Sequence, residues 1–245
     1  MTKKLMALAL GGAAVLMASP ALADGYAAKA APVACCEANW NGIYVGAAIG
    51  VAAFITKQTD VVTPPGAPPG IDPFDGVAGR GFLGSVAVGL DRQIAPGIVV
   101  GIFADYDFTD AEFNHTNGIN EKIRMNDIWS VGARVGLARS CCALWYVTAG
   151  YTSADFKYHF ADTASYNFNT RVGGWFAGLG AEQQIGRGLA LKLEYRFSRF
   201  DDTSFSFVDG GGARHDVTKD PELHTIRLGL TYKFDVHTPR AVPLK

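Results

Sequence analysis

Hydrophobic side chains alternate with small or polar ones along eight segments of about ten residues each. In the first segment Ile43, Val45 and Ala47 share one face, while Tyr44 and Gly46 share the other. The same period of two recurs near residues 82–91, 98–107, 129–137, 145–151, 175–184, 191–198 and 226–234. The pattern predicts eight β-strands that each carry one apolar face.

The connections between these segments separate a membrane barrel from a soluble sandwich, because alternation within a single strand fits both. Tight turns are expected at 94–97, 139–142 and 186–188, whereas long loops are expected near 56–79, 110–126, 153–172 and 199–222. Short turns on one side and long loops on the other are typical of outer-membrane barrels. We therefore predict an all-β fold, an eight-stranded antiparallel up-and-down transmembrane β-barrel with short turns and both termini in the periplasm.

Aromatic residues near the predicted strand ends support membrane insertion, because Trp and Tyr concentrate at the two membrane–water interfaces. The candidates for these girdles are Trp40, Trp129, Trp145, Trp175, Tyr151 and Phe234.

The first residues have the layout of an export signal: Lys3 and Lys4, an apolar run over 5–17, then Pro20 and small residues. We expect cleavage after Ala23, a periplasmic segment over 24–39, the barrel over 40–234 and a flexible periplasmic tail over 235–245. The near balance of 22 basic and 23 acidic residues argues against nucleic acid as a partner.

Ten charged side chains fall on the inward face of the predicted strands. They are Asp91, Asp105, Asp107, Glu182 and Glu194, with Arg134, Lys192, Arg196, Arg227 and Lys233. The interior of an eight-stranded barrel is just wide enough for side chains, and an unpaired buried charge is costly. The balance favours an ion-paired plug, with Arg134 bound to Asp105 or Asp107, over the alternative of a narrow ion path.

Candidate chemistry is sparse. Asp105 and Asp107 share a face, but no histidine lies inward on a neighbouring predicted strand, which disfavours paired-carboxylate catalysis and a metal site. The remaining arrangement for a hydrolase is His224 with Ser204 or Ser206. We expect no enzyme activity and no cofactor.

Two vicinal cysteine pairs, Cys35/Cys36 and Cys141/Cys142, are both expected at the periplasmic mouth of the barrel. Export permits oxidation, so one or two disulfides between the pairs are predicted, against free thiols or intermolecular bridges.

Several segments resemble the small porin-like outer-membrane β-barrel proteins of Gram-negative bacteria, which are OmpA-like in their barrel domain and include surface antigens. The segments are WNGIYVGAAIG (40–50), GFLGSVAVGLDRQ (81–93), GIVVGIFADYDFTD (97–110), VGARVGLA (131–138), LKLEYRF (191–197) and HTIRLGLTYKF (224–234). The resemblance implies insertion by the outer-membrane assembly machinery, which recognises an aromatic-ended last strand. Tyr232 and Phe234 match that signal, although the chain continues past it.

The third predicted loop is rich in aromatic residues, among them Phe156, Tyr158, His159 and Phe160. One interpretation is a hairpin that extends beyond the membrane with its rings packed across strands. The other, implied by haemin-binding relatives of the family, is a haem contact through His159 and Tyr158.

The sequence thus predicts a structural protein of the cell outer membrane that supports the envelope and presents surface loops. The alternatives are a small-solute porin, and a haem-binding receptor or adhesin. The expected partners are outer-membrane lipid and lipopolysaccharide, the assembly machinery, and host or envelope molecules at the loops.

Overall fold

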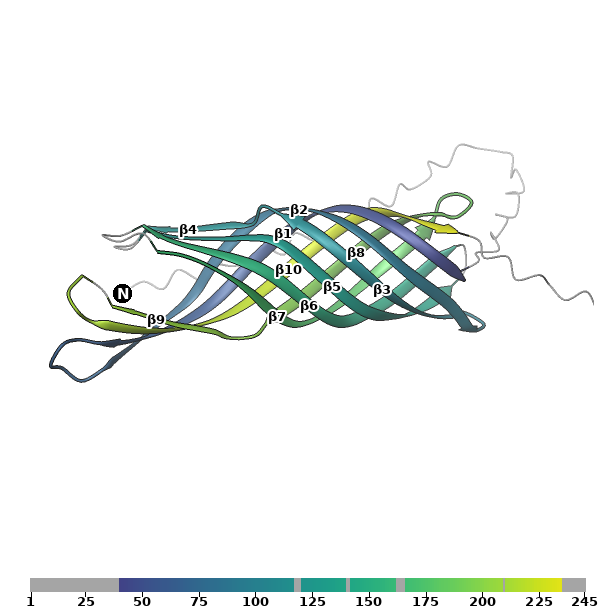
Figure 1. The fold of residues 1–245 in the computed structure, drawn as a ribbon. Coiled ribbons are helices and arrows are strands. Elements are labelled where there is room, and N and C mark those ends of the chain that lie inside the picture. Colours follow the sequence, from purple (N-terminus) through teal and green to yellow (C-terminus); the bar gives the residue numbers. More distant parts are fainter. Residues whose placement is uncertain (1–39, 117–119, 140–141, 162–165, 209, 235–245) are drawn as a thin grey trace, which may run out of the picture. The chain divides into compact units, whose positions relative to one another are not determined.

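The computed structural model describes residues 40–116, 120–139, 142–161, 166–208 and 210–234, which form a single antiparallel sheet (Figure 1). Its strands are β1 (Gly42–Thr63), β2 (Gly70–Ala95), β3 (Ile98–Thr109), β4 (Glu112–Thr116), β5 (Asn120–Arg139), β6 (Ala143–Ala161), β7 (Tyr166–Gln184), β8 (Leu189–Phe200), β9 (Thr203–Val208) and β10 (Arg214–Phe234). No helix in these ranges has the length and hydropathy needed to cross a bilayer. The predicted signal peptide, periplasmic segment and tail lie outside the described residues.

The sheet closes on itself, because β1 pairs with β2 on one side and with β10 on the other. The ring has eight strand positions. β3 and β4 are consecutive pieces of one strand position, which lies between β2 and β5. In the same way, β8 and β9 are consecutive pieces of the position beside β10. Closure leaves no open sheet edge within the ring, which is what a lipid environment demands. The predicted up-and-down barrel is confirmed.

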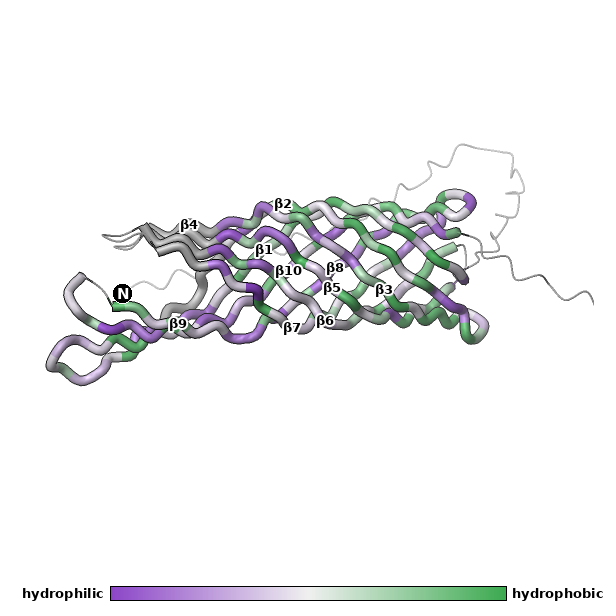
Figure 2. Tube along the Cα trace, viewed as in Figure 1, coloured by the Kyte–Doolittle hydropathy of each residue, from purple (hydrophilic) through white to green (hydrophobic). Residues whose placement is uncertain are grey.

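The outer wall of the barrel carries the apolar face of the strands, as the alternation predicts. Ile49 is 73% exposed, Phe82 74% and Val147 62%, and large hydrophobic side chains cover the wall around all eight positions. Hydrophobic positions are most frequent toward the end with the tight turns, and hydrophilic positions become frequent further along the strands, toward β9 (Figure 2). An apolar surface of this extent is suited to lipid rather than to water.

The tight turns lie together at one end of the barrel, called here the short-turn end. They join β2 to β3, β5 to β6 and β7 to β8. The first places Pro96 before Gly97, whose φ of 79° is in the left-handed region that glycine enters without steric cost. The opposite end is called the long-hairpin end.

The long connections differ from the prediction, because most of their residues continue as paired strands. A tilted strand needs about 9–11 residues to cross the bilayer, whereas β1 has 22, β2 has 26 and β10 has 21. The proline-rich stretch in the first connection is a tight turn: Ala67 N donates to Pro64 O at 3.3 Å and Gly66 has a φ of 73°. Pro65 before a left-handed glycine is the signature of a type II turn.

Beyond the membrane band the barrel separates into two sheets. One contains β9, β10, β1 and the first half of β2, and the other contains β4, β5, β6 and β7. The β7–β8 ladder ends at the pair Gly174–Phe200, and β2 meets β4 at one pair, Arg80–Glu112. Figure 1 shows the two sheets diverging toward β4 and β9.

Aromatic pairs mark both borders of the apolar band. At the long-hairpin end the ring centroids of Trp129 and Tyr151 lie 5.5 Å apart and those of Trp175 and Phe197 lie 5.6 Å apart. At the short-turn end the rings of Tyr232 and Phe234 are 5.1 Å apart. Trp40 was predicted in a girdle, and that prediction is wrong.

Trp40 is only 1% exposed and turns into the barrel mouth, where the Lys233 ammonium lies 4.7 Å from its ring centroid. It directly precedes β1, so its place near a strand end could not distinguish an interfacial side chain from an inward one.

Candidate functional site: the charged interior of the barrel

The inward face of β10 gives the order of layers along the barrel axis. From the short-turn end it presents Lys233, then Thr231 and Gly229, then Arg227 and Thr225, and finally Leu223. The charged and hydroxyl side chains among these are at most 4% exposed. Two charged clusters therefore lie in the interior, followed by an apolar layer at the long-hairpin side.

The first charged cluster is centred on Arg134 and contains Asp91, Glu182 and Lys233. Arg134 Nε donates to Asp91 Oδ1 at 2.8 Å, and its Nη1 donates to Glu182 Oε1 at 2.6 Å. The Lys233 ammonium donates to Asp91 Oδ2, which also accepts from Arg134 Nη2. The guanidinium also lies 4.4 Å from the Tyr44 ring centroid. Side chains from β2, β5, β7 and β10 thus meet across the barrel.

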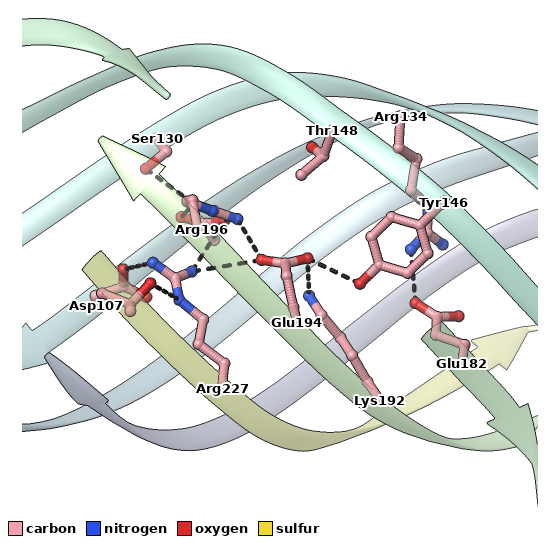
Figure 3. Close-up of polar contacts among 12 residues, drawn as sticks. Asp107, Ser130, Arg134, Tyr146, Thr148, Glu182, Lys192, Glu194, Arg196 and Arg227 are labelled. Atoms are coloured by element: carbon pink, nitrogen blue, oxygen red, sulfur yellow. Dashed lines mark hydrogen bonds and ion pairs between the residues drawn. The ribbon is translucent and has the colours of Figure 1, made fainter. Parts of the chain in front are cut away.

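The second charged cluster is centred on Arg196 and contains Asp105, Asp107, Lys192, Glu194 and Arg227 (Figure 3). Arg196 Nη2 donates to Asp105 Oδ2 at 2.7 Å and to Glu194 Oε1 at 2.9 Å. Arg227 Nη2 donates to Asp107 Oδ2 at 2.6 Å. Lys192 Nζ lies 3.1 Å from Glu194 Oε2. Figure 3 shows Glu194 between Arg196, Arg227, Lys192 and Tyr146.

Tyr146 joins the two charged clusters. Its hydroxyl donates to Glu194 Oε2 at 2.8 Å, and its ring centroid lies 5.1 Å from the Arg134 guanidinium carbon. Each charged cluster has as many acidic as basic side chains, so neither leaves a net charge in the interior. Hydrogen bonds reach both carboxylate oxygens of Asp91, Asp105 and Glu194, and they offset the desolvation that buried ions require.

Glycines on the inward faces make room for these large side chains. A Cβ at Gly101 would collide with the Asp91 carboxylate and would lie 3.2 Å from Arg134 Cγ. Gly101 is the neighbour of both residues in the ladders, paired with Asp91 on β2 and with Arg134 on β5. The inward glycines in the sequence pattern thus set the width available to the charged clusters.

Apolar side chains lie on either side of the charged clusters along the axis. The lower plug, at the short-turn end, consists of Trp40, Val99, Leu144 and Tyr146. The upper plug, toward the long-hairpin end, consists of Ala52, Phe54, Leu83, Ala111, Met125, Ile128, Ala154, Phe156, Val172, Phe200 and Leu223. Phe156 is at its centre, with ring centroids 5.8 Å from Phe54 and 5.4 Å from Phe200.

A small cavity lies between the plugs. The cavity is lined by Tyr44, Phe103, Arg134, Lys192 and other side chains and has a volume of about 10 Å³. This is about the space that one water molecule requires. The described interior therefore resembles a packed core more than a channel.

The sequence located the ten charged side chains but assigned one partner wrongly. Arg134 does not bind Asp105 or Asp107; Asp91 and Glu182 are its partners, while Asp105 and Asp107 face Arg196 and Arg227. Strand order alone does not give the stagger of the barrel, which decides which inward residues lie at one height.

The two apolar plugs were missed. Phe156 was attributed to the third loop, but it is fully buried inside the barrel. A signal existed: counting by twos along β6 from Leu144 through Tyr146 and Thr148 arrives at Phe156 on the same inward face.

The structure does not bring the proposed hydrolase residues together. His224 Nδ1 lies 2.8 Å from the Tyr195 hydroxyl on the outer wall. Ser206 donates to Asp216 at 2.5 Å, and Ser204 lies opposite Thr218, six residues along β10 from His224. Among the residues described, no group of three or more His, Cys, Asp or Glu side chains is arranged to hold a metal ion.

The other candidate residues occupy the two ends of the barrel. Tyr232 and Phe234 are about half exposed on the outer wall at the short-turn end. Cys142 is disulfide-bonded, with a φ of 68°, while Cys35, Cys36 and Cys141 lie outside the described residues. The backbone of Tyr158 and His159 pairs with Phe168 and Asn167 in the β6–β7 hairpin, and their side chains are outside the described set.

A closed antiparallel ring with a lipid-compatible wall, two aromatic girdles and a neutralised charged interior defines the class of integral outer-membrane β-barrel proteins. The chain belongs to the outer membrane protein beta-barrel domain family, whose model matches residues 8–234. It lies in the outer membrane.

Two curated relatives are the 31 kDa outer-membrane immunogenic proteins of Brucella melitensis biotype 1 and Brucella suis biovar 1. Each is 27% identical over 246 residues, and each alignment covers 92% of this chain and 96% of the relative.

Solved structures with similar folds include the outer membrane protein OprG from Pseudomonas aeruginosa, with 13% identity, coverage of 81% of this chain and 98% of that one, and a TM-score of 0.47. Ail, the attachment invasion locus protein of Yersinia pestis, is 15% identical to this chain. The match covers 79% of this chain and 99% of Ail, with a TM-score of 0.42.

Proposed function

We propose that the protein is a non-conducting structural barrel that reinforces the outer membrane and presents a protein surface on the cell exterior. The observation that carries this proposal is the sequence of layers inside the barrel, an apolar plug, two neutral charged clusters and a second apolar plug. A solute would have to displace both the packed side chains and the ion pairs. This favours a structural role over a small-solute porin.

The long-hairpin end is the surface that we assign to the exterior, with the short turns in the periplasm. Outer-membrane barrels have short periplasmic turns and longer external connections, which supports this orientation. The two sheets extend beyond the apolar band and offer paired, ordered backbone to the surroundings. The name of the Brucella relatives, outer-membrane immunogenic protein, agrees with a surface that other molecules encounter.

No catalytic step is assigned to this chain. The buried carboxylates are held by arginine and lysine side chains inside the barrel, where a substrate would have no access between the plugs. The haem-binding alternative depends on the side chains of Tyr158 and His159, which lie outside the described set.

Proteoliposome swelling tests this function. Liposomes that contain the purified barrel should resist swelling in isotonic solutions of a small sugar, whereas liposomes with a general porin should swell. In cells, deletion of the protein should increase sensitivity to detergent, and the intact chain should restore resistance. Rapid swelling with the purified barrel would establish the porin function instead.

A further inference from the structure

A pocket of about 230 Å³ opens on the outer wall of the barrel, where β5, β6 and β7 leave the apolar band. Its lining includes Asn126, Asp127, Asp155, Lys157, Asn169 and Arg171. Residues two apart on a strand share a face, so Asp155 and Lys157 point outward with Tyr151, and Arg171 points outward with Trp175. The polar side chains that β6 and β7 contribute to the pocket therefore face the surroundings of the barrel, while Phe156 and Thr170, which also line it, occupy the inward-facing positions between them.

The pocket lies directly beyond the aromatic girdle at the long-hairpin end. Tyr151 pairs with Trp175, and Asp155 pairs with Arg171 four residues further along the same two strands. Four residues correspond to about 13 Å along a strand, and less along the membrane normal because the strands tilt. Aromatic girdles lie at the level where acyl chains meet headgroups, so the pocket is at headgroup depth.

The polar groups of the pocket are held in fixed positions. Arg171 Nε and Nη2 donate to the two oxygens of Asp155 at 2.7 and 2.6 Å, which fixes the plane of the guanidinium. Its Nη1 has no hydrogen-bond partner among the described residues. Asn126 and Asp127 come from the β-bulge where β5 shifts register against β6 between Met125 and Ile128. A bulge re-aims side chains out of the regular ladder.

Below the pocket the outer wall is unusually smooth. Ala133 pairs with Ala149, and Ala149 pairs with Ala177, so three small outward side chains adjoin one another on β5, β6 and β7. Acyl chains can approach the backbone closely over this row, on the hydrocarbon side of Trp129, Tyr151 and Trp175. A headgroup site and a smooth acyl-chain surface thus follow one another along the same three strands.

We infer that this pocket binds the phosphorylated sugar headgroup of an outer-leaflet glycolipid. Arg171 and Lys157 supply the cationic donors that a sugar phosphate requires, while the amides of Asn126 and Asn169 and the carboxylate of Asp127 match sugar hydroxyl groups. The row of alanines below favours a lipid-linked ligand over a soluble sugar phosphate. The inference rests on the orientation given under the proposed function, with the long-hairpin end outside.

Native mass spectrometry of the purified barrel in detergent, titrated with lipid A, tests this site. The Lys157→Gln/Arg171→Gln variant should bind lipid A at least about tenfold more weakly than the wild type. The matched control is Arg92→Gln/Arg187→Gln, which also removes two positive charges, but at exposed positions of the short-turn end. This control variant should bind lipid A as the wild type does. Both variants should keep the heat-modifiable migration on gels that indicates a folded barrel.

Three comparisons complete the test. Dephosphorylated lipid A and phosphatidylglycerol should bind weakly, and glucosamine phosphate without acyl chains should bind more weakly than lipid A. Equal lipid A affinity for both double variants, or equal binding of the dephosphorylated lipid, would overturn the inference. An epitope inserted between Gly66 and Ala67 tests orientation separately: antibody binding on intact cells supports it, and its absence rejects the orientation whatever the lipid result.

Discussion

The strands continue beyond the apolar band at the long-hairpin end, and this part of the barrel is called here the extension. Ion pairs inside the barrel and ion pairs on the extension have similar geometry but very different surroundings. Arg134 and Asp91 approach to 2.5 Å with side chains 3% and 0% exposed, whereas Arg124 and Glu112 approach to 2.8 Å with side chains 51% and 26% exposed. The interior pairs have lost their water, so each charge depends on its protein partner. The extension pairs retain water as an alternative partner, which makes each of them dispensable.

The hydrogen-bond distance therefore does not report the energetic importance of a pair. What matters is the cost of leaving one partner behind. In the interior that cost is several kcal/mol, because the remaining ion has neither water nor a counter-charge. On the extension the same loss is largely compensated by solvent.

The largest expected effect is that of Arg196→Met. This change removes the arginine that donates hydrogen bonds to both Asp105 and Glu194, and we expect the free energy of unfolding to fall by about 3–5 kcal/mol. Denaturant titration in lipid vesicles, followed by tryptophan fluorescence and by heat-modifiable migration, measures the loss.

A compensating variant separates charge imbalance from lost packing. Adding Asp105→Asn to Arg196→Met should recover a large part of the loss, because the cluster then again has equal numbers of acidic and basic side chains, Asp107 and Glu194 against Lys192 and Arg227. A loss below about 1 kcal/mol for Arg196→Met alone would mean that water reaches this part of the interior.

Gly101→Ala should have an intermediate effect. The added methyl group collides with the Asp91 carboxylate, and overpacking of a filled core typically costs about 1–3 kcal/mol. Gly84→Ala is the matched control on the neighbouring strand, since nothing lies within 4 Å of a Cβ built there. The free energy of unfolding in lipid vesicles should distinguish the two variants. Equal stability of the two would contradict the tight packing of the first charged cluster.

The exposed pair of the extension should contribute little. Arg124→Gln removes a charged partner of Glu112, and we expect a change of about 0.2–1 kcal/mol, which high salt should reduce further. The same denaturant titration, with and without added salt, provides the measurement. An effect as large as that of Arg196→Met would remove the distinction between the two regions.

The smallest expected effect is a pH dependence of the extension. Hydrogen bonding from Arg171 lowers the pKa of Asp155 below its ordinary value of 3.8. A lowered folded-state pKa contributes stability above the ordinary carboxyl range, and this contribution is lost as the pH falls through the lowered pKa. The stability difference between wild type and Asp155→Asn should therefore shrink in strong acid. A difference that instead grew with acidification would contradict the assigned pairing.

The sequence predicted the faces of the barrel well because the side-chain period of a strand is two. Val86 and Ile226 point outward, and Asp105 and Arg227 point inward, as alternation requires. This rule needs only the local sequence. It holds strictly within the apolar band, because the outward side chains there face lipid. The strand number followed from the eight segments that alternate in this way, and the alternation of tight and long connections indicated a membrane barrel.

Three features could not be obtained in this way. The partners of Arg134 depend on how far opposite walls are staggered, which is a property of the closed ring and not of any one strand. Trp40 has the composition and position of a girdle residue but turns inward. The ladders at the long-hairpin end are hidden in sequence, because beyond the membrane both faces of a strand can be polar and a period of two no longer stands out.

Single-channel recording in planar lipid bilayers tests the closed interior most directly. The purified barrel should insert without reproducible conductance steps, because the two plugs and the charged clusters occupy the full length of the lumen. Large, reproducible steps from the intact, folded barrel would contradict the central claim.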